Sequence, residues 1–138
     1  MKKHKPTSVF VTNQPGGTAQ HGPPGAALWP IVRAYVPQRD AWLASGVGTA
    51  GIIRERPDGR WASAYFTFSV LEGGVLVVFG RDETTPADND ALLESSTDQI
   101  PPFEPGPPER AAAFIRGALA FGAEQGHLFP PRELAPRL

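Results

Sequence analysis

The sequence predicts an α+β fold in which a small, mostly antiparallel β-sheet is covered on one face by a single helix. Two observations lead to this fold class: β-rich runs flank a Pro-Asp-Gly corner at 57–59, and residues 107–125 carry apolar side chains at helical spacing. The length of 138 residues suits one domain, and the 15 Gly and 16 Pro indicate irregular flanks. We therefore expect an extended arm (1–29), one domain (30–131) and a tail (132–138).

About four strands are expected, over residues 31–36, 47–56, 60–70 and 75–79. The central two form a hairpin, because Pro and Asp suit the corner of a type I turn and Gly suits the left-handed position after them. This loop sets a register in which one face of the hairpin is mostly apolar away from the turn and the other is mixed. The expected pairs on the first face are Arg56–Arg60, Arg54–Ala62, Ile52–Ala64 and Ala50–Phe66.

Residues 107–125 form the strongest predicted helix, with a proline in its first turn and Gly126 as its C-terminal cap. A small face of Ala113, Gly117 and Ala120 allows close backbone approach. We expect this face to pack on the sheet of the same chain, with a homodimer as the alternative. The apolar stripe of the helix consists of Ala111, Phe114, Ile115, Ala118, Phe121 and Gly122.

Two other segments connect these elements. Residues 38–45 are expected to form a short helical turn with Trp42 and Leu43 facing inward. Residues 81–106 are acidic and rich in proline, with no basic residue after Arg81. We expect them to form a connection outside the sheet–helix unit, with a brief helix at 87–95.

The run GVGTAG at 46–51 has the G-x-G-x-x-G spelling of a dinucleotide-binding loop. In such folds the pattern follows a buried strand and opens a helix, whose N-terminus receives the pyrophosphate. Here the run continues directly into a β-rich segment, and no acidic residue follows at the distance where a ribose would sit. We therefore expect a strand whose small residues let Tyr65, Phe66 or the helix lie close. No cofactor is assigned to it.

Three arginines, Arg54, Arg56 and Arg60, are expected on one face at the hairpin tip. Like charges opposite one another repel, and a phosphate or an acidic partner surface would relieve that repulsion. Trp61 beside them offers a ring on which a base can stack. These four residues are the candidate anion or nucleic-acid contact. The alternative is a set of solvated side chains with acidic neighbours.

No catalytic, cofactor-binding or metal-binding residue is assigned. The chain has no Cys, and His4, His21 and His127 lie in no metal-ligand spacing. The Asp-Asn-Asp order at 88–90 lacks the later Gly and Glu of a calcium loop. Motifs of serine hydrolases, phosphate-loop proteins and zinc proteases do not occur in the sequence. We expect a protein that is not an enzyme and that uses no cofactor.

The formal net charge is −1, so no strong overall field draws nucleic acid or an anionic membrane to the chain. The basic N-terminus is not followed by the apolar stretch of a signal peptide, and no apolar run has the length of a membrane span. We expect a cytoplasmic protein without membrane contact. The arm lysines Lys2, Lys3 and Lys5 contrast with the acidic segment 81–106, which suggests a contact between the two within one molecule or between two copies.

Three segments resemble a family of small bacterial proteins of planctomycete-like genomes: PIVRAYV (30–36), GTAGIIRERPDGRWASAYFTF (48–68) and ERAAAFIRGALAFGAEQGHLFPP (109–131). The resemblance implies an α+β fold with the same order of strand, hairpin and helix, and it brings no activity. In that family an acidic residue, a Cys and a Leu-Gly-Val-Lys-like run follow the hairpin, where this chain has Ser69, Glu72 and GGVLVV. The resemblance therefore assigns no catalytic residue to this chain.

The expected function is that of a non-catalytic accessory protein, which docks onto a larger bacterial assembly through its arm, its sheet edge or its acidic segment. Flanks that fold poorly alone often become ordered on a protein partner. The alternative is a small nucleic-acid-contacting module that uses the hairpin arginines and Trp61. A small enzyme is a third interpretation, which a deep pocket lined by carboxylates would favour.

Overall fold

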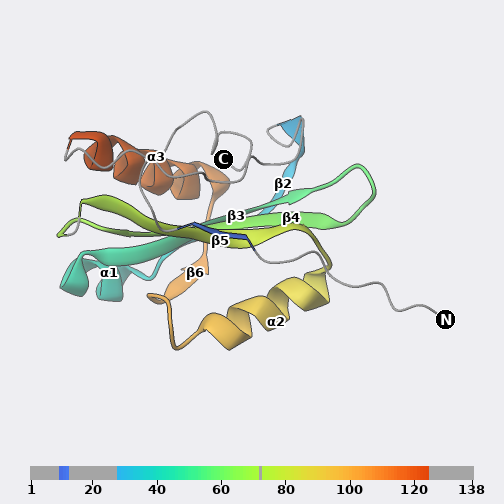
Figure 1. The fold of residues 1–138 in the computed structure, drawn as a ribbon, viewed down its shortest axis with the longest axis horizontal. Coiled ribbons are helices and arrows are strands. Elements are labelled where there is room, and N and C mark those ends of the chain that lie inside the picture. The colour runs from blue at the N-terminus through green and yellow to red at the C-terminus, as the bar shows by residue number, and fades with distance from the viewer. Residues whose placement is uncertain (1–9, 13–27, 72, 125–138) are drawn as a thin grey trace.

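The computed structural model describes residues 10–12, 28–71 and 73–124, and it confirms the predicted α+β fold (Figure 1). One antiparallel sheet contains the strands in the order β1-β5-β4-β3-β2-β6. Helix α3 covers one face of this sheet and helix α2 lies against the other. In chain order the elements are β1 (Phe10–Thr12), β2 (Ile31–Pro37), α1 (Arg39–Ser45), β3 (Val47–Glu55), β4 (Trp61–Ser69), β5 (Gly74–Thr84), α2 (Pro86–Ser96), β6 (Phe103–Pro105) and α3 (Pro108–Glu124).

The central hairpin has the register that the sequence predicts. Strands β3 and β4 pair along their whole length, with Arg54 opposite Ala62. Beyond them the Arg56 amide donates to the Arg60 carbonyl at 2.7 Å. Gly59 takes the left-handed conformation, with φ 83°, that the corner requires. Alternate side chains of the two strands therefore point to the faces that the sequence assigns them.

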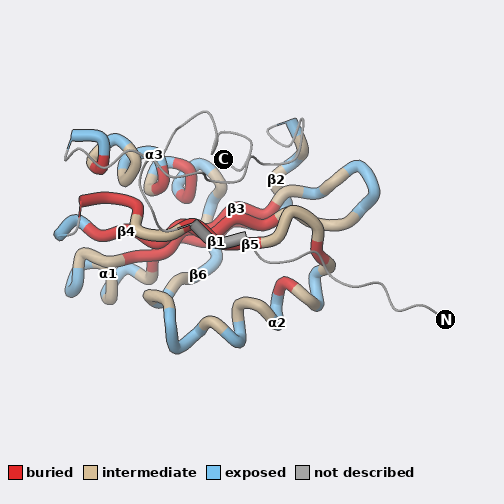
Figure 2. Tube along the Cα trace, viewed as in Figure 1, coloured by how far each residue is buried: buried red, intermediate tan, exposed pale blue. Residues whose placement is uncertain are grey.

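The larger apolar core lies between α3 and the sheet (Figure 2). Ile52, Phe66 and Ile115 are almost completely removed from solvent there. The helix approaches β5 closely at Gly74, where an added Cβ would lie 2.6 Å from the carbonyl oxygen of Ala118. Because glycine has no side chain, it allows the helix to pack directly on the sheet at this position.

The small-residue face of α3 does not pack on the sheet, and that prediction is wrong. Ala113, Gly117 and Ala120 are exposed. The buried stripe of the helix is centred instead on Ala111 and Ile115. A helix of this kind buries one stripe only, and the stripe with the greater apolar surface is the one that is buried.

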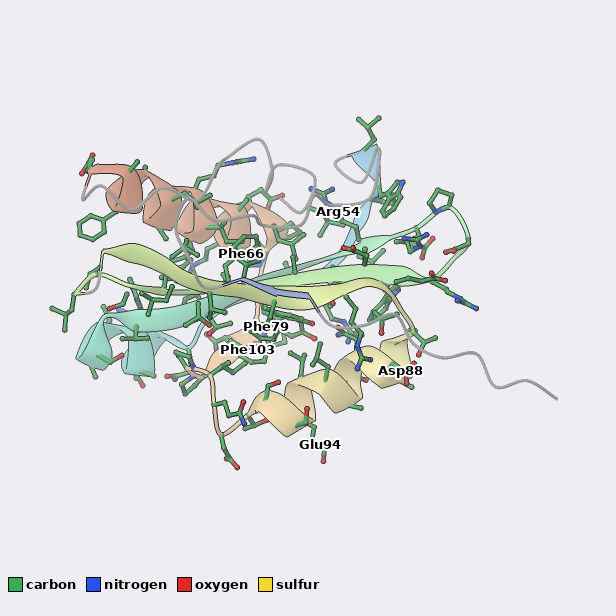
Figure 3. All side chains as sticks on the ribbon, viewed as in Figure 1. Arg54, Phe66, Phe79, Asp88, Glu94 and Phe103 are labelled. Carbon is green, nitrogen blue, oxygen red and sulfur yellow. The ribbon has the colours of Figure 1, made fainter. Side chains whose placement is uncertain are left out.

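The second face of the sheet is also covered, which the sequence did not predict. Segment 81–106 was expected to lie outside the folded unit; it supplies the end of β5, all of α2, and β6, which pairs with β2. The predicted brief helix at 87–95 is confirmed as α2. Figure 3 shows Phe79 and Phe103 on the α2 side of the sheet and Phe66 on the α3 side. This second core contains Tyr35, Ile53, Tyr65 and Phe79, against which Trp61, Leu92, Leu93, Ile100 and Phe103 pack.

Helix α1 turns only one of its two predicted side chains inward. Trp42 packs against the main core, whereas Leu43 is 68% exposed. Neighbouring residues in a helix point about 100° apart, so a short helix lying on a surface buries one of them. Gln38 caps the start of α1 by accepting from the Ala41 amide, and Gly46, with φ 69°, caps its end.

Of the predicted arm, the structure describes only Phe10–Thr12, Leu28 and Trp29, and β1 extends the sheet beside β5. The other arm residues and the tail 132–138 lie outside the described residues, as do all three histidines, His4, His21 and His127. Within the described ranges, no helix combines the length and the apolar character needed to cross a membrane.

Candidate functional site

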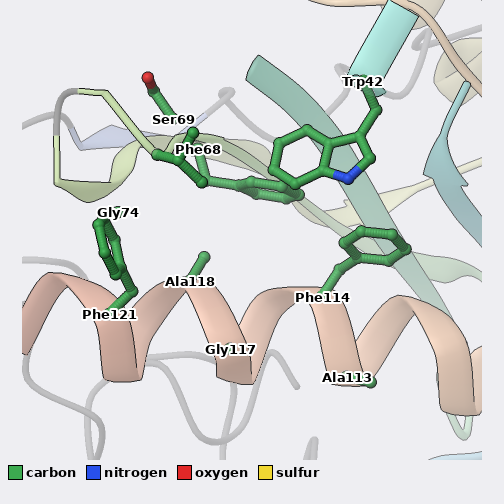
Figure 4. Close-up of a pocket in the computed structure, with 10 residues that line it drawn as sticks. Trp42, Phe68, Ser69, Gly74, Ala113, Phe114, Gly117, Ala118 and Phe121 are labelled. Carbon is green, nitrogen blue, oxygen red and sulfur yellow. The ribbon is translucent and has the colours of Figure 1, made fainter. Parts of the chain in front are cut away.

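An apolar pocket of about 260 Å³ opens between α3 and one end of the sheet (Figure 4). The helix contributes residues spaced along two of its turns, and the opposite wall comes from α1, the end of β4 and the start of β5. Its lining consists of Trp42, Phe68, Ser69, Val70, Gly74, Ala113, Phe114, Gly117, Ala118 and Phe121. Such a concave apolar site is a candidate for binding.

Three aromatic rings form the inner wall of this pocket. Trp42 meets Phe68 edge-on at 5.3 Å between ring centroids and meets Phe114 edge-on at 5.8 Å. Phe68 and Phe114 stack at 6.0 Å with an interplanar angle of 19°. Each of these arrangements is favourable for aromatic pairs and fixes the rings relative to one another. The wall is therefore formed before any ligand arrives.

Small residues and an exposed rim keep the pocket open. A Cβ added at Gly117 would meet no atom within 4 Å, so the space beside this helix position is empty. Val70 and Leu71, in the turn after β4, are 48% and 84% exposed. Large exposed apolar side chains beside a pocket are typical of a surface that contacts another molecule.

The pocket offers no acid–base chemistry of its own. Apart from the indole N–H of Trp42, the polar side-chain group among the lining residues is the Ser69 hydroxyl, which accepts from the Leu71 amide. Across the described part of the chain, no group of three or more His, Cys, Asp or Glu could hold a metal ion. What the pocket can do chemically is to remove an apolar group from water.

Most of the glycine run lies in a strand, as the sequence predicts, and its first residue caps α1, which was not predicted. Gly46 ends α1 and the remainder lies in β3, which pairs with both β2 and β4. The ring of Tyr65 lies on Gly51, where an added Cβ would be 2.5 Å from the ring. On the other face, Gly48 makes room for Pro37 and Trp42. The glycines therefore serve packing on both sides of the strand.

The structure brings the predicted arginines together at the hairpin, but it separates Trp61 from them. Arg54 and Ala62 face the α3 side, whereas Trp61, opposite Glu55, faces the α2 side. There the guanidinium of Arg33 lies 4.9 Å from the centre of the Trp61 ring. No single ligand surface therefore contains all four candidate residues.

Two of the hairpin arginines bind groups of the chain itself. Arg60 forms a salt bridge with Glu83. Arg56 donates to the Asp82 carbonyl oxygen at 2.8 Å and lies 3.4 Å from a carboxylate oxygen of Asp58. These contacts hold the hairpin against β5. The Asp58 carboxylate also accepts from the Arg60 amide, and this hydrogen bond is the main cause of its lowered pKa.

Arg54 has a different environment. One guanidinium nitrogen donates to the Trp29 carbonyl at 2.7 Å, and the buried Nε has no hydrogen-bond partner. Burial lowers the pKa of this arginine. Trp29 also lies under the guanidinium of Arg56, with 5.1 Å to the ring centre. Neither Trp29 nor this difference among the arginines could be identified from the sequence, because both depend on where the chain before β2 lies.

A second polar cluster that the sequence did not predict lies under α2. Asn89 is completely buried and accepts from the Tyr65 hydroxyl at 2.8 Å. Burial raises the pKa of Tyr65, so its hydroxyl remains a hydrogen-bond donor. Asp88 lies in the first turn of the helix and its amide donates to the Thr85 hydroxyl. The Asp-Asn-Asp order at 88–90 therefore begins a capped helix.

Comparison with known proteins adds no relative, because no family model, curated protein or solved structure matches the chain. The resemblance drawn from the sequence therefore stays a prediction.

Proposed function

We propose that the protein is a non-catalytic interaction module, which docks onto a partner protein by receiving one or two apolar side chains in the pocket beside α3. The observation that carries this proposal is the preformed aromatic wall of Trp42, Phe68 and Phe114 with open space beside Gly117. Apolar anchors that fill such pockets commonly contribute most of the binding energy of a protein interface.

The size of the pocket favours a side chain over a free small molecule. Its volume of about 260 Å³ lies just below the range of roughly 300–1,000 Å³ that holds drug-sized ligands. The exposed rim residues Val70 and Leu71 would contact the part of the partner that surrounds the anchor. Such residues around the anchor would belong to the apolar core that protein interfaces have inside a polar rim.

The nucleic-acid alternative has less support. Arg60 is paired with Glu83, and Trp61 lies on the other face of the sheet. A phosphate backbone would also meet a chain with a formal net charge of −1. This alternative remains a prediction, and the experiment that tests it is oligonucleotide binding at two salt concentrations, with Arg56→Glu as the variant.

The proposal is tested with a random peptide library displayed on phage and selected on the immobilised full chain. We expect enriched peptides to share one or two large apolar residues, and their binding to be lost in Gly117→Leu, which fills the pocket from a position with free space. Ala123→Leu is the matched control, because Ala123 is exposed and does not line the pocket.

Two results would contradict the proposal. One is a selected sequence without apolar anchors. The other is equal binding by wild type, Gly117→Leu and Ala123→Leu, which would place the interaction elsewhere on the surface.

A further inference from the structure

Arg54 is a half-buried cation without an ionic partner among the described residues. Its Nε is buried and makes no hydrogen bond, and its one hydrogen bond runs to a neutral backbone carbonyl, that of Trp29. Arginines that contact carboxylates show the contrast: Arg33 faces Asp90 and Arg60 faces Glu83. Removing a cation from water without a partner is unfavourable, so proteins retain such groups where they serve a purpose.

The pKa values of two arginines express the same contrast. The pKa of Arg33 is raised, mainly by its hydrogen bond with the Tyr35 hydroxyl, with a further contribution from Asp90. The pKa of Arg54 is lowered by burial, with no opposing contribution from an acidic group. An anion bound beside Arg54 would favour its charged form and so oppose the effect of burial on this pKa.

Arg54, Arg56 and Trp29 form a cluster at the hairpin, the Arg54 cradle. The guanidinium of Arg54 and that of Arg56 are gathered around a single residue, Trp29, one through the backbone carbonyl and the other over the ring. Arg56 is already partly neutralised by Asp58, and Arg60 by Glu83. Of these three arginines, Arg54 is the one with no carboxylate contact among the described residues. This matches a singly charged group better than a chain of phosphates.

We propose that Arg54, supported by Arg56 and Trp29, binds a carboxylate of a partner protein. The inference goes beyond the proposed function, since this cradle lies at the hairpin end of β3 whereas the pocket is lined by residues around the opposite end of the sheet. The bound carboxylate would accept, in place of water, from guanidinium N–H groups that do not donate to the Trp29 carbonyl.

The test uses NMR of the arginine Nε–H groups in the full chain. The probes are acetyl-triglutamate amide, inorganic phosphate and a short oligothymidylate, each titrated separately. We expect the peptide to shift the Arg54 resonance saturably and at lower concentration than phosphate does. Arg54→Gln is expected to weaken peptide binding about tenfold or more, since it removes the charged donor of the hydrogen bonds to the carboxylate. Arg116→Gln, at an exposed position of α3, should leave it unchanged.

A stability measurement separates a binding role from a structural one. Because Arg54 lacks an ionic partner, we expect Arg54→Gln to keep or raise the melting temperature, as is common for residues that serve function at some cost to stability. A melting temperature lowered by several degrees, together with no selective loss of peptide binding, would overturn the proposal. So would a peptide that shifts all arginine resonances alike, or tighter, strongly salt-dependent binding of the oligothymidylate, which would indicate a nucleic-acid surface.

Discussion

The two faces of the sheet differ in how completely they are covered. On the α2 face, aromatic rings pack against one another, and polar groups pair in the Tyr65–Asn89 hydrogen bond and the Thr49–Thr67 hydroxyl pair, although the buried Asn89 Nδ2 has no hydrogen-bond partner. On the α3 face, the helix covers the middle of the sheet and leaves an apolar pocket near one end and a poorly paired arginine, Arg54, near the other.

This difference indicates where to look for function in a small domain whose described residues contain no group that could hold a metal ion. Groups whose interactions are completed inside the chain contribute mainly to stability. An open apolar pocket or a buried cation without an ionic partner can instead bind part of another molecule. Three substitutions examine how closely α3 packs on β5, how much the Tyr65–Asn89 hydrogen bond contributes to stability, and whether the space beside Gly117 is empty.

The largest effect is expected for Gly74→Ala, which should lower the free energy of unfolding by about 3 kcal/mol. The new Cβ would lie 2.6 Å from the Ala118 carbonyl oxygen, and a positive φ of 108° is itself unfavourable for alanine. Urea denaturation measures the change. Gly59→Ala is the control, because φ is 83° there but a Cβ meets no atom within 4 Å.

Gly59→Ala should therefore cost only the backbone strain, about 1 kcal/mol. If the two substitutions lower the free energy of unfolding equally, α3 does not pack on β5 as closely as the structure indicates, and the pocket between them has a different shape.

A smaller effect is expected for Tyr65→Phe on the α2 face, about 1–3 kcal/mol of lost stability. The substitution removes the hydroxyl that donates to Asn89 and leaves a completely buried amide oxygen without that donor. Tyr35→Phe is the matched control, since the Tyr35 hydroxyl accepts only a long contact of 3.4 Å from Arg33. If both substitutions have the same small effect, the polar cluster under α2 does not hold the helix.

Much of the fold could be predicted because its determinants are local. The Pro-Asp-Gly corner fixes the hairpin register, and the apolar spacing of 107–125 identifies α3. The α2 face could not be predicted in the same way. Its apolar residues, among them Leu92 and Phe103, are scattered among acidic residues and prolines, so they show no periodic pattern. They form a core only where the chain folds back onto the sheet.

The candidate sites were predicted less well, because they depend on contacts between distant segments. Trp42, Phe68 and Phe114 form one wall only after three elements have assembled, and nothing in their spacing indicates this. At the hairpin, strand alternation predicts the arginines on one face, and Arg54 and Arg56 do both contact Trp29. Alternation cannot tell which of them finds a carboxylate. Arg60 does, through Glu83, and Arg54 does not among the described residues.

The smallest expected effect, and the one with a distinctive sign, is a stabilisation by Gly117→Ala of about 0.5–1 kcal/mol. Glycine inside a helix is less favourable than alanine, and the added Cβ at this position enters the empty space beside the pocket. Gly122→Ala is the control: Gly122 is buried, and its backbone lies against Gly74, so the same substitution there should destabilise. Thermal or urea unfolding compares the two variants. A loss of stability in both would mean that the space beside Gly117 is filled, and the pocket could not then receive the side chain of a partner.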